Sequence, residues 1–160
     1  MTAVRSEDVR VEITVDAPIE TAFKVFTEGI DTWWPRGYYI GAGEMVEKVL
    51  EPRVGGKLYG READGTRCPT GTVVAWDPPR HVAFSWDVTL DWAAQSDPEQ
   101  ASRVDVTFEA TSGEQTAVTL VHSGFERHGA GWEAMRDSVG GEGGWSSLVG
   151  AFAKAATTAA

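Results

Sequence analysis

The fold is decided by residues 9–28, which read VRVEITVDAPIETAFKVFTE. The first seven residues alternate apolar and polar side chains, the period-two pattern of a half-buried strand. Asp16 then offers a helix cap, and Pro18 suits a first helical turn. The apolar residues that follow recur at helical spacing: Ile19, Ala22, Phe23, Phe26 and Ile30. We therefore expect a strand that runs directly into an amphipathic helix.

Outward from this unit, about ninety residues form strand-like runs that are broken by Gly, Pro and Asp turns. A second amphipathic helix, near 144–156, closes the chain. Its apolar stripe is Trp145, Leu148, Val149, Phe152 and Ala156. This order of elements predicts an α+β fold. A curved antiparallel sheet of six or seven strands wraps around a long C-terminal helix, with one or two short helices after the first strand. Residues 155–160 are expected to fray.

Composition limits the function classes. The 160 residues predict a single domain over 1–160, with an ordered core at about 8–156. A net charge of −10 opposes binding to nucleic acid or to anionic membranes, and no apolar run approaches the ~18 residues that span a bilayer. The lone Cys68 cannot form an internal disulfide and residues 1–10 lack a signal-like apolar core, so we expect a cytoplasmic protein.

Five short motifs resemble the START-like, helix-grip superfamily, and its activator of heat-shock-protein-90 ATPase homologue 1-like branch in particular. In chain order they are Val15–Phe23 with Val25-Phe26, Glu51–Gly56, Trp76–Pro79, His122–Phe125 and Gly144-Trp145. The resemblance covers about residues 9–156 and implies the helix-grip fold. It also implies bacterial family members that are mostly uncharacterised, within a superfamily that includes lipid and hormone binders, polyketide cyclases and aromatases, and oxygenase subunits. Two local departures, a long loop at 87–102 and the pair Trp33-Trp34, are where we expect ligand selectivity to lie.

Seven Trp residues predict aromatic walls for a space between helix and sheet. Trp33, Trp34, Tyr38 and Tyr39 are expected at one mouth of the cavity, although a packed lid over the core is the alternative. Trp92 is expected to fold back as a flap from the acidic loop. The full set of predicted ligand-binding residues is Trp33, Trp34, Tyr38, Tyr39, Phe84, Trp86, Trp92, His122, Phe125, Trp145, Leu148 and Phe152.

His122 is the one candidate for catalysis. Strand alternation with Val118 and Leu120 points it to the concave face, where a histidine could act as a general base or as a polar anchor. The alternative is a buried histidine that is hydrogen-bonded for structural reasons. Ser123 falls on the opposite face, which argues against a Ser–His nucleophile pair.

The sequence predicts neither a metal site nor a tightly held cofactor. His81, His122 and His128 lack the paired spacing of metal ligands. The glycine-rich 140–144 segment lacks the Lys-Ser/Thr of a phosphate loop and is expected to let the last helix move. The strands expected to form the floor of the cavity carry Arg61, Glu62 and Glu44. One interpretation is a buried Arg–Glu ion pair that orients a polar ligand, and the other is solvated cross-strand pairs.

These observations favour a protein that binds a small apolar or aromatic molecule. Two alternatives stay open: an enzyme of the polyketide cyclase, dehydratase or hydrolase type acting in the same cavity, and a co-chaperone-like interaction domain. A homodimer is compatible with the sequence.

Overall fold

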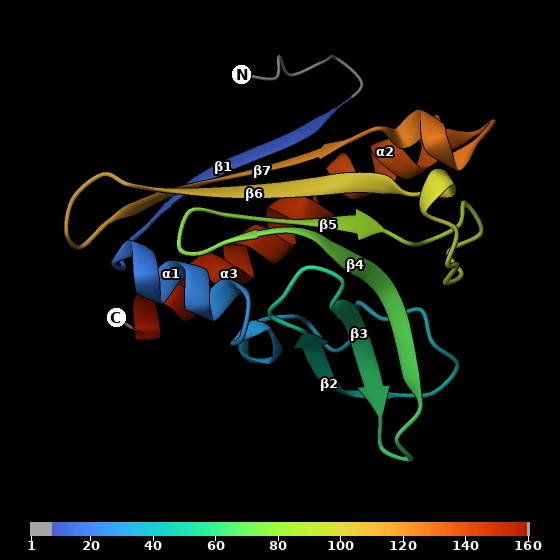
Figure 1. Cartoon of the computed structure of the whole chain (residues 1–160), viewed down its shortest axis with the longest axis horizontal. Helices are drawn as coiled ribbons and strands as arrows, with labels where there is room; N and C mark the ends of the chain where they lie inside the picture. The colour runs from blue at the N-terminus through green and yellow to red at the C-terminus, as the bar shows by residue number, and fades with distance from the viewer. Residues whose placement is uncertain (1–7, 160) are drawn as a thin grey trace.

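The chain begins as the sequence predicts, with a strand that leads directly into a helix. The computed structural model describes residues 8–159, and in it β1 (Val9–Val15) is followed by α1 (Ile19–Phe26) (Figure 1). The predicted Asp16 cap is wrong. Pro18 occupies the N-cap position, and Asp16, two residues earlier, accepts a hydrogen bond from Gln115 Nε2 instead (2.7 Å).

Seven antiparallel strands form one curved sheet, which confirms the predicted helix-grip fold. After β1 these are β2 (Met45–Leu50), β3 (Lys57–Glu62), β4 (Arg67–Asp77), β5 (His81–Trp86), β6 (Ser102–Ala110) and β7 (Thr116–Ser123). Their order in the sheet is β1-β7-β6-β5-β4-β3-β2. Every neighbouring pair is antiparallel, and β1 and β2 are the two edges.

Short helical segments connect the strands. The 3-10 helices are η1 (Ile30–Thr32), η2 (Pro98–Gln100) and η3 (Phe125–His128), and α2 (Trp132–Gly140) precedes the last helix. None of the described helices is both long enough and apolar enough to cross a membrane.

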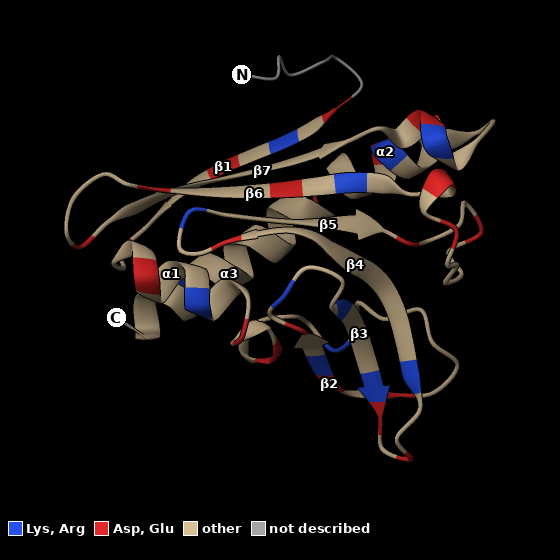
Figure 2. Cartoon of the chain, viewed as in Figure 1, with Lys and Arg blue, Asp and Glu red and all other residues tan. Residues whose placement is uncertain are grey.

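The C-terminal helix α3 (Trp145–Ala159) lies across the sheet, beside β1 and α1 (Figure 1). Its predicted apolar stripe is the buried one, and Phe152 meets Phe26, Trp33 and Phe108 at ring-centroid distances of 5.2, 5.7 and 6.4 Å. Lys154 is the single charged residue among the fifteen residues of α3, and the ribbon of this helix in Figure 2 is accordingly almost entirely tan.

The prediction that residues 155–160 fray is wrong for 155–159, while residue 160 lies outside the described part. The helix continues to Ala159, because alanine is the best helix former and Ala156 is buried against the core. Thr158 Oγ1 also donates to the Lys154 carbonyl at 3.0 Å, which satisfies one acceptor of the last turn.

The sheet divides into two parts that β4 joins. Register shifts at Leu58/Tyr59 and at Val73/Ala75 interrupt the pairing on both sides of this long strand. Such bulges bend a strand and increase its twist. In Figure 1, β2, β3 and the far end of β4 accordingly diverge from the plane of β5, β6 and β7. This divergence places β2 opposite the N-terminal end of α3 and positions the site.

Candidate functional site

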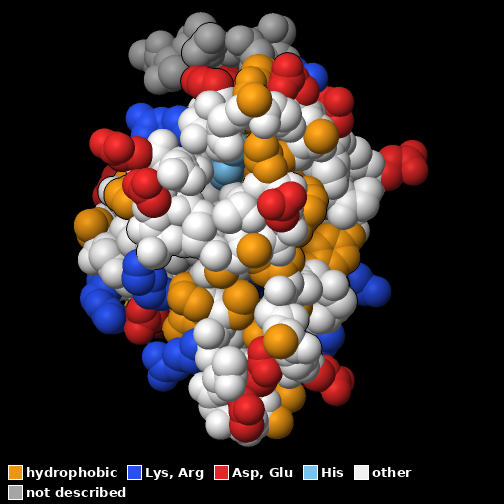
Figure 3. All heavy atoms as spheres, turned by 90° about the vertical axis from the view of Figure 1, so that its right-hand side faces the viewer, with side chains coloured by type: hydrophobic (Ala, Val, Ile, Leu, Met, Phe, Trp, Pro, Cys, Tyr) orange, Lys and Arg blue, Asp and Glu red, His pale blue; other side chains and the backbone are white. Residues whose placement is uncertain are grey.

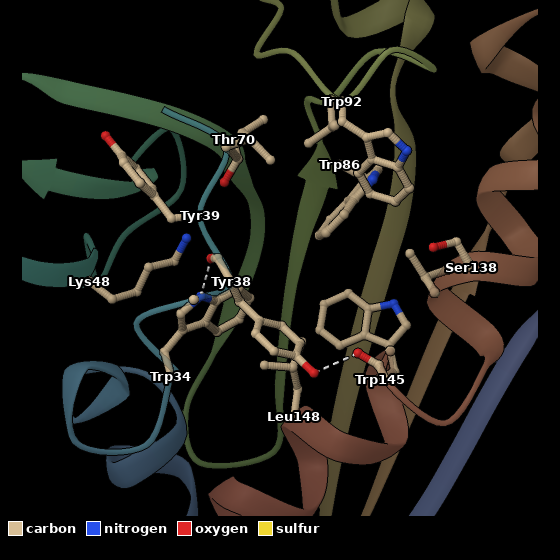
Figure 4. Close-up of a pocket in the computed structure, with 16 residues that line it drawn as sticks. Trp34, Tyr38, Tyr39, Lys48, Thr70, Trp86, Trp92, Ser138, Trp145 and Leu148 are labelled. Atoms are coloured by element: carbon tan, nitrogen blue, oxygen red, sulfur yellow. Dashed lines mark hydrogen bonds between the residues drawn. The ribbon is translucent and has the colours of Figure 1, made fainter. Parts of the chain in front are cut away.

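A cavity of about 290 Å³ lies between the diverging arm of the sheet and the start of α3. Sixteen residues line it: Trp34, Gly37, Tyr38, Tyr39, Ile40, Lys48, Thr70, Trp86, Val88, Trp92, Ser138, Val139, Gly143, Gly144, Trp145 and Leu148 (Figure 4). They come from the 34–40 segment, β2, β4, β5, the 87–101 loop, α2, the turn at 143–144 and α3. Strands, helices and loops therefore all contribute to the cavity.

One wall consists of indole rings. Trp86 ends β5, Trp145 begins α3, and their ring centroids lie 5.5 Å apart at an interplanar angle of 63°. Trp34 meets Trp145 edge-on at 6.5 Å. Edge-to-face contacts fix the rings against one another and leave their free faces to the cavity. Figure 4 shows Trp86, Trp92 and Trp145 together on one side.

The 37–43 loop is tied across the mouth of the cavity. Tyr38 Oη donates to the Gly143 carbonyl at 2.7 Å, and Trp34 Nε1 donates to the Tyr38 carbonyl at 2.9 Å. The first bond joins residues 105 positions apart and connects the loop to the segment before α3. On the face seen in Figure 3, hydrophobic side chains gather between charged groups.

Lys48 stands on the opposite wall. Its side chain points from β2 toward the cavity (Figure 4), the residue is only 4% exposed, and Nζ lies 4.3 Å from the centroid of the Trp34 ring. It is the one charged residue among the sixteen described lining residues. Burial lowers the pKa of Lys48 from 10.5 to about 8, and the nearby Cys68 opposes this shift.

Trp92 covers the cavity from the 87–101 loop. It is 40% exposed and has a left-handed backbone (φ 60°), which is unusual for a residue with a side chain. A tight turn holds it there, since the Trp92 amide donates to the Thr89 carbonyl at 2.9 Å. Beside it in Figure 4, the Trp86 indole N–H is buried without a hydrogen-bond partner among the described residues. A buried donor without an acceptor is costly, and this N–H is such a donor in the wall of the site.

His122 lies behind this wall, outside the set of lining residues. Trp145 Nε1, which can only donate, lies 3.0 Å from His122 Nδ1. Because Nδ1 must therefore accept, the neutral ring carries its proton on Nε2, and Nε2 donates to Ser102 Oγ at 2.7 Å. Ser102 Oγ lies 2.7 Å from His128 Nε2, and the serine hydroxyl can donate a hydrogen bond to this nitrogen.

We call Trp145, His122, Ser102 and His128 the buried histidine relay. The two imidazoles of this relay are neutral. His122 is fully buried and stacks on Phe125 at 4.1 Å. Burial lowers the pKa of His122 well below its usual value, and the neighbouring His128 adds to this shift. Burial also lowers the pKa of His128, against the effects of a hydrogen bond to the Val88 backbone and of Asp87.

The structure brings seven of the twelve predicted binding residues to the cavity: Trp34, Tyr38, Tyr39, Trp86, Trp92, Trp145 and Leu148. Five do not line it: Trp33, Phe84, His122, Phe125 and Phe152. Trp33 faces the groove between α1 and α3, and its Nε1 donates to the Val25 carbonyl at 2.9 Å. Both nitrogens of His122 are engaged, so a role as general base has no geometric support in this conformation.

The predicted Arg61, Glu62 and Glu44 do not line the cavity either. Arg61 pairs with Glu47 at 2.9 Å near the surface, and Glu62 accepts a 2.5 Å hydrogen bond from Tyr39 Oη. This bond and burial raise the pKa of Tyr39, which therefore stays a neutral phenol. In the part of the chain that the structure describes, no cluster of three or more potential metal ligands occurs.

Sequence reasoning missed Lys48 and Ser102. Lys48 has the same alternation parity as Leu50, which is a signal that it faces inward, but a register shift between Met45 and Glu47 breaks that parity earlier in β2. Ser102 had no local signal, because its partners are 20 and 26 residues away.

The curved sheet that wraps around α3 defines a helix-grip protein, and its aromatic cavity has the size of a small molecule. The profile of the family described as Activator of Hsp90 ATPase homolog 1-like protein matches residues 16–156, and the chain belongs to this family.

Solved structures agree with this assignment. An anthrahydroquino-γ-pyrone synthase, Txn09, complexed with SUM, is 32% identical over 92% of this chain and 95% of that chain, with a TM-score of 0.64. CalC from Micromonospora echinospora, described as a self-sacrificing resistance protein, is 26% identical over 94% of both chains, with a TM-score of 0.65. A protein from Nitrosomonas europaea shares 14% identity over 98% of this chain and 99% of that chain, with a TM-score of 0.70, and shows the fold alone. Comparison with curated protein sequences gives no match.

Proposed function

We propose that this protein binds a flat aromatic small molecule in the cavity between β2 and α3. The observation that carries the proposal is the cavity itself, about 290 Å³, which is lined by four indoles and one buried amine. Ligand sites are typically apolar hollows with a few placed polar groups, and rigid rings sandwich flat molecules well. The similarity to the synthase Txn09, whose name describes a fused aromatic product, supports the same ligand class.

A neutral probe tests this proposal. We expect 7-methoxycoumarin to quench tryptophan emission, because four indoles line the cavity. Leu148→Phe should fill part of the volume and weaken binding several-fold. Ala151→Leu is the matched control, since it adds bulk to the same helix but faces the groove on the other side of α3. Unchanged emission from a folded protein, or equal weakening by both variants, would contradict binding in this cavity.

A catalytic role is the second candidate, favoured by the 32% identity to a synthase. The described group placed to take a proton in the cavity is Lys48 rather than His122, since His122 is fully engaged. The neutral amine would accept a proton from an activated carbon and return one from solvent. Benzoylacetone in deuterium oxide tests this: wild-type protein should accelerate exchange at its central carbon and Lys48→Met should not. Equal exchange with both proteins would count against a catalytic Lys48.

A further inference from the structure

We propose that Lys48 selects the ligand of this cavity by pairing with an acidic hydroxyl, phenolic or enolic, on a flat aromatic molecule. The inference rests on the proposed function and names the chemical class that the site accepts. Three observations carry it: the isolation of the amine, its position in the cavity, and the charge of the whole protein.

Lys48 has no counter-ion among the residues that the structure describes. Lys48 is 4% exposed, and no described residue forms a salt bridge or a side-chain hydrogen bond with Nζ. Its one described side-chain interaction is with the face of Trp34, at 4.3 Å from the ring centroid. A buried ammonium is costly unless an acceptor pairs with it. The cavity that Lys48 lines is the place from which an acceptor can reach the amine.

The titratable groups around Lys48 do not fill that role. Asp31, from η1, accepts a hydrogen bond from the Lys48 backbone amide at 2.9 Å, and its carboxylate forms a salt bridge with Arg36 at 2.8 Å. The Cys68 thiol on β4 has its pKa raised by burial and stays protonated. Tyr39 and Glu62 are bonded to each other. Each candidate anion is thus either committed elsewhere or neutral.

A weak acid fits the site better than a permanent anion. The protein carries a net charge of −10, which repels anions, whereas a phenol or an enol approaches uncharged. Inside the cavity the hydroxyl proton can move to the lone pair of the neutral amine or, where the amine is already protonated, pass to solvent; both routes give a phenolate beside an ammonium. Proton sharing is easiest when the two pKa values are close, and the lowered pKa of Lys48, about 8, lies near that of an activated phenol.

A pair of matched probes tests the inference. 7-Hydroxycoumarin carries an acidic phenol whose ionised form has its own absorption band, and 7-methoxycoumarin is its capped counterpart. With wild-type protein at neutral pH we expect 7-hydroxycoumarin to bind about tenfold more tightly. Its phenolate band should appear in the complex at a pH where the free probe is still protonated.

Two variants complete the design. Lys48→Met should abolish the phenolate band and equalise the two affinities while still binding 7-methoxycoumarin. Lys57→Met, the control, removes an exposed amine that is bonded to Thr72 outside the cavity and should behave as wild type. Equal affinities and no band in wild type, or an unchanged preference in Lys48→Met, would overturn the inference and leave the proposed function standing. Failure of both coumarins to bind would overturn both.

Discussion

At the scale of single residues, the site is defined by a buried lysine whose burial destabilises the folded state. Lys48 is an amine held among aromatic rings, where burial favours its neutral form. A side chain without charge at this position would pack more favourably. That the chain carries a lysine here, on the cavity wall, is the residue-level argument for binding.

Lys48→Met should therefore stabilise the protein. The folded-state pKa, about 8, is below the ordinary 10.5, so the folded state binds fewer protons between these values and the penalty is complete below pH 8. At pH 7 we expect Lys48→Met to raise the free energy of unfolding by roughly 1–3 kcal/mol in urea titrations. The gain should shrink as pH rises from 8 and vanish above 10.5, where the wild-type amine is neutral in both states. A loss of stability at pH 7, or a gain independent of pH, would show that the amine is not desolvated.

The buried histidine relay predicts acid sensitivity. Burial depresses the pKa of His122. As pH falls below about 6.5, this histidine therefore binds a proton in the unfolded state but stays neutral in the folded state. The free energy of unfolding should then fall with a slope approaching about 1.4 kcal/mol per pH unit for this residue.

His122→Gln checks this assignment. It should be less stable than wild type by about 1–3 kcal/mol at pH 7.5, because Trp145 Nε1 and Ser102 lose a matched partner. Its stability should also fall less steeply between pH 6.5 and pH 5. Parallel pH profiles for the two proteins would assign the acid sensitivity to other groups.

At the scale of elements, the 87–101 loop forms the part of the cavity wall that carries Trp92. Near Trp92 it is held by bonds within the loop itself, namely the Thr89–Trp92 turn, the Thr89–Ala93 contacts and an isolated bridge between Val88 and Ala94. Loops of this kind open at low free-energy cost. We infer that ligand exchange proceeds past Trp92.

Trp92→Ala should then speed the release of bound 7-methoxycoumarin by about tenfold, since one ring contact of about 1.4 kcal/mol is lost. Stability should change little, because Trp92 is 40% exposed and lies outside the buried core. Trp92→Phe, which keeps a ring, is the control and should stay close to wild type. Stopped-flow displacement measures the rates, and identical release from Trp92→Ala and wild type would place the exit elsewhere.

The elements themselves were largely predictable, for local reasons. The strand and helix at 9–28 and the stripe of α3 depend on side-chain periodicity, which is written in the sequence. The inward position of Lys48 depends on a bulge in β2, and a bulge changes which face a residue occupies without altering composition. The bond between Ser102 and His122 depends on the pairing of β6 with β7, which brings the two strands side by side.

At the scale of the whole molecule, the cavity is a consequence of sheet curvature. The bulges beside β4 turn β2 and β3 away from β5–β7, and α3 covers the concave side without filling the space that opens (Figure 1). Aromatic rings dominate its wall because large rigid side chains can bound a space without collapsing into it. Phe84 and Phe152, which were predicted to bind the ligand, belong instead to the packed core beneath the cavity. Side-chain periodicity alone could not distinguish core positions from cavity positions.

The central claim is that this space is vacant and takes an aromatic ring next to Lys48. Crystals soaked in 7-hydroxycoumarin test it most directly. The account predicts density for the fused rings between Lys48 and Trp145, with the phenolic oxygen within hydrogen-bonding distance of Nζ. Coumarin density at another site, or side chains closed over a filled interior while the probe binds in solution, would contradict it.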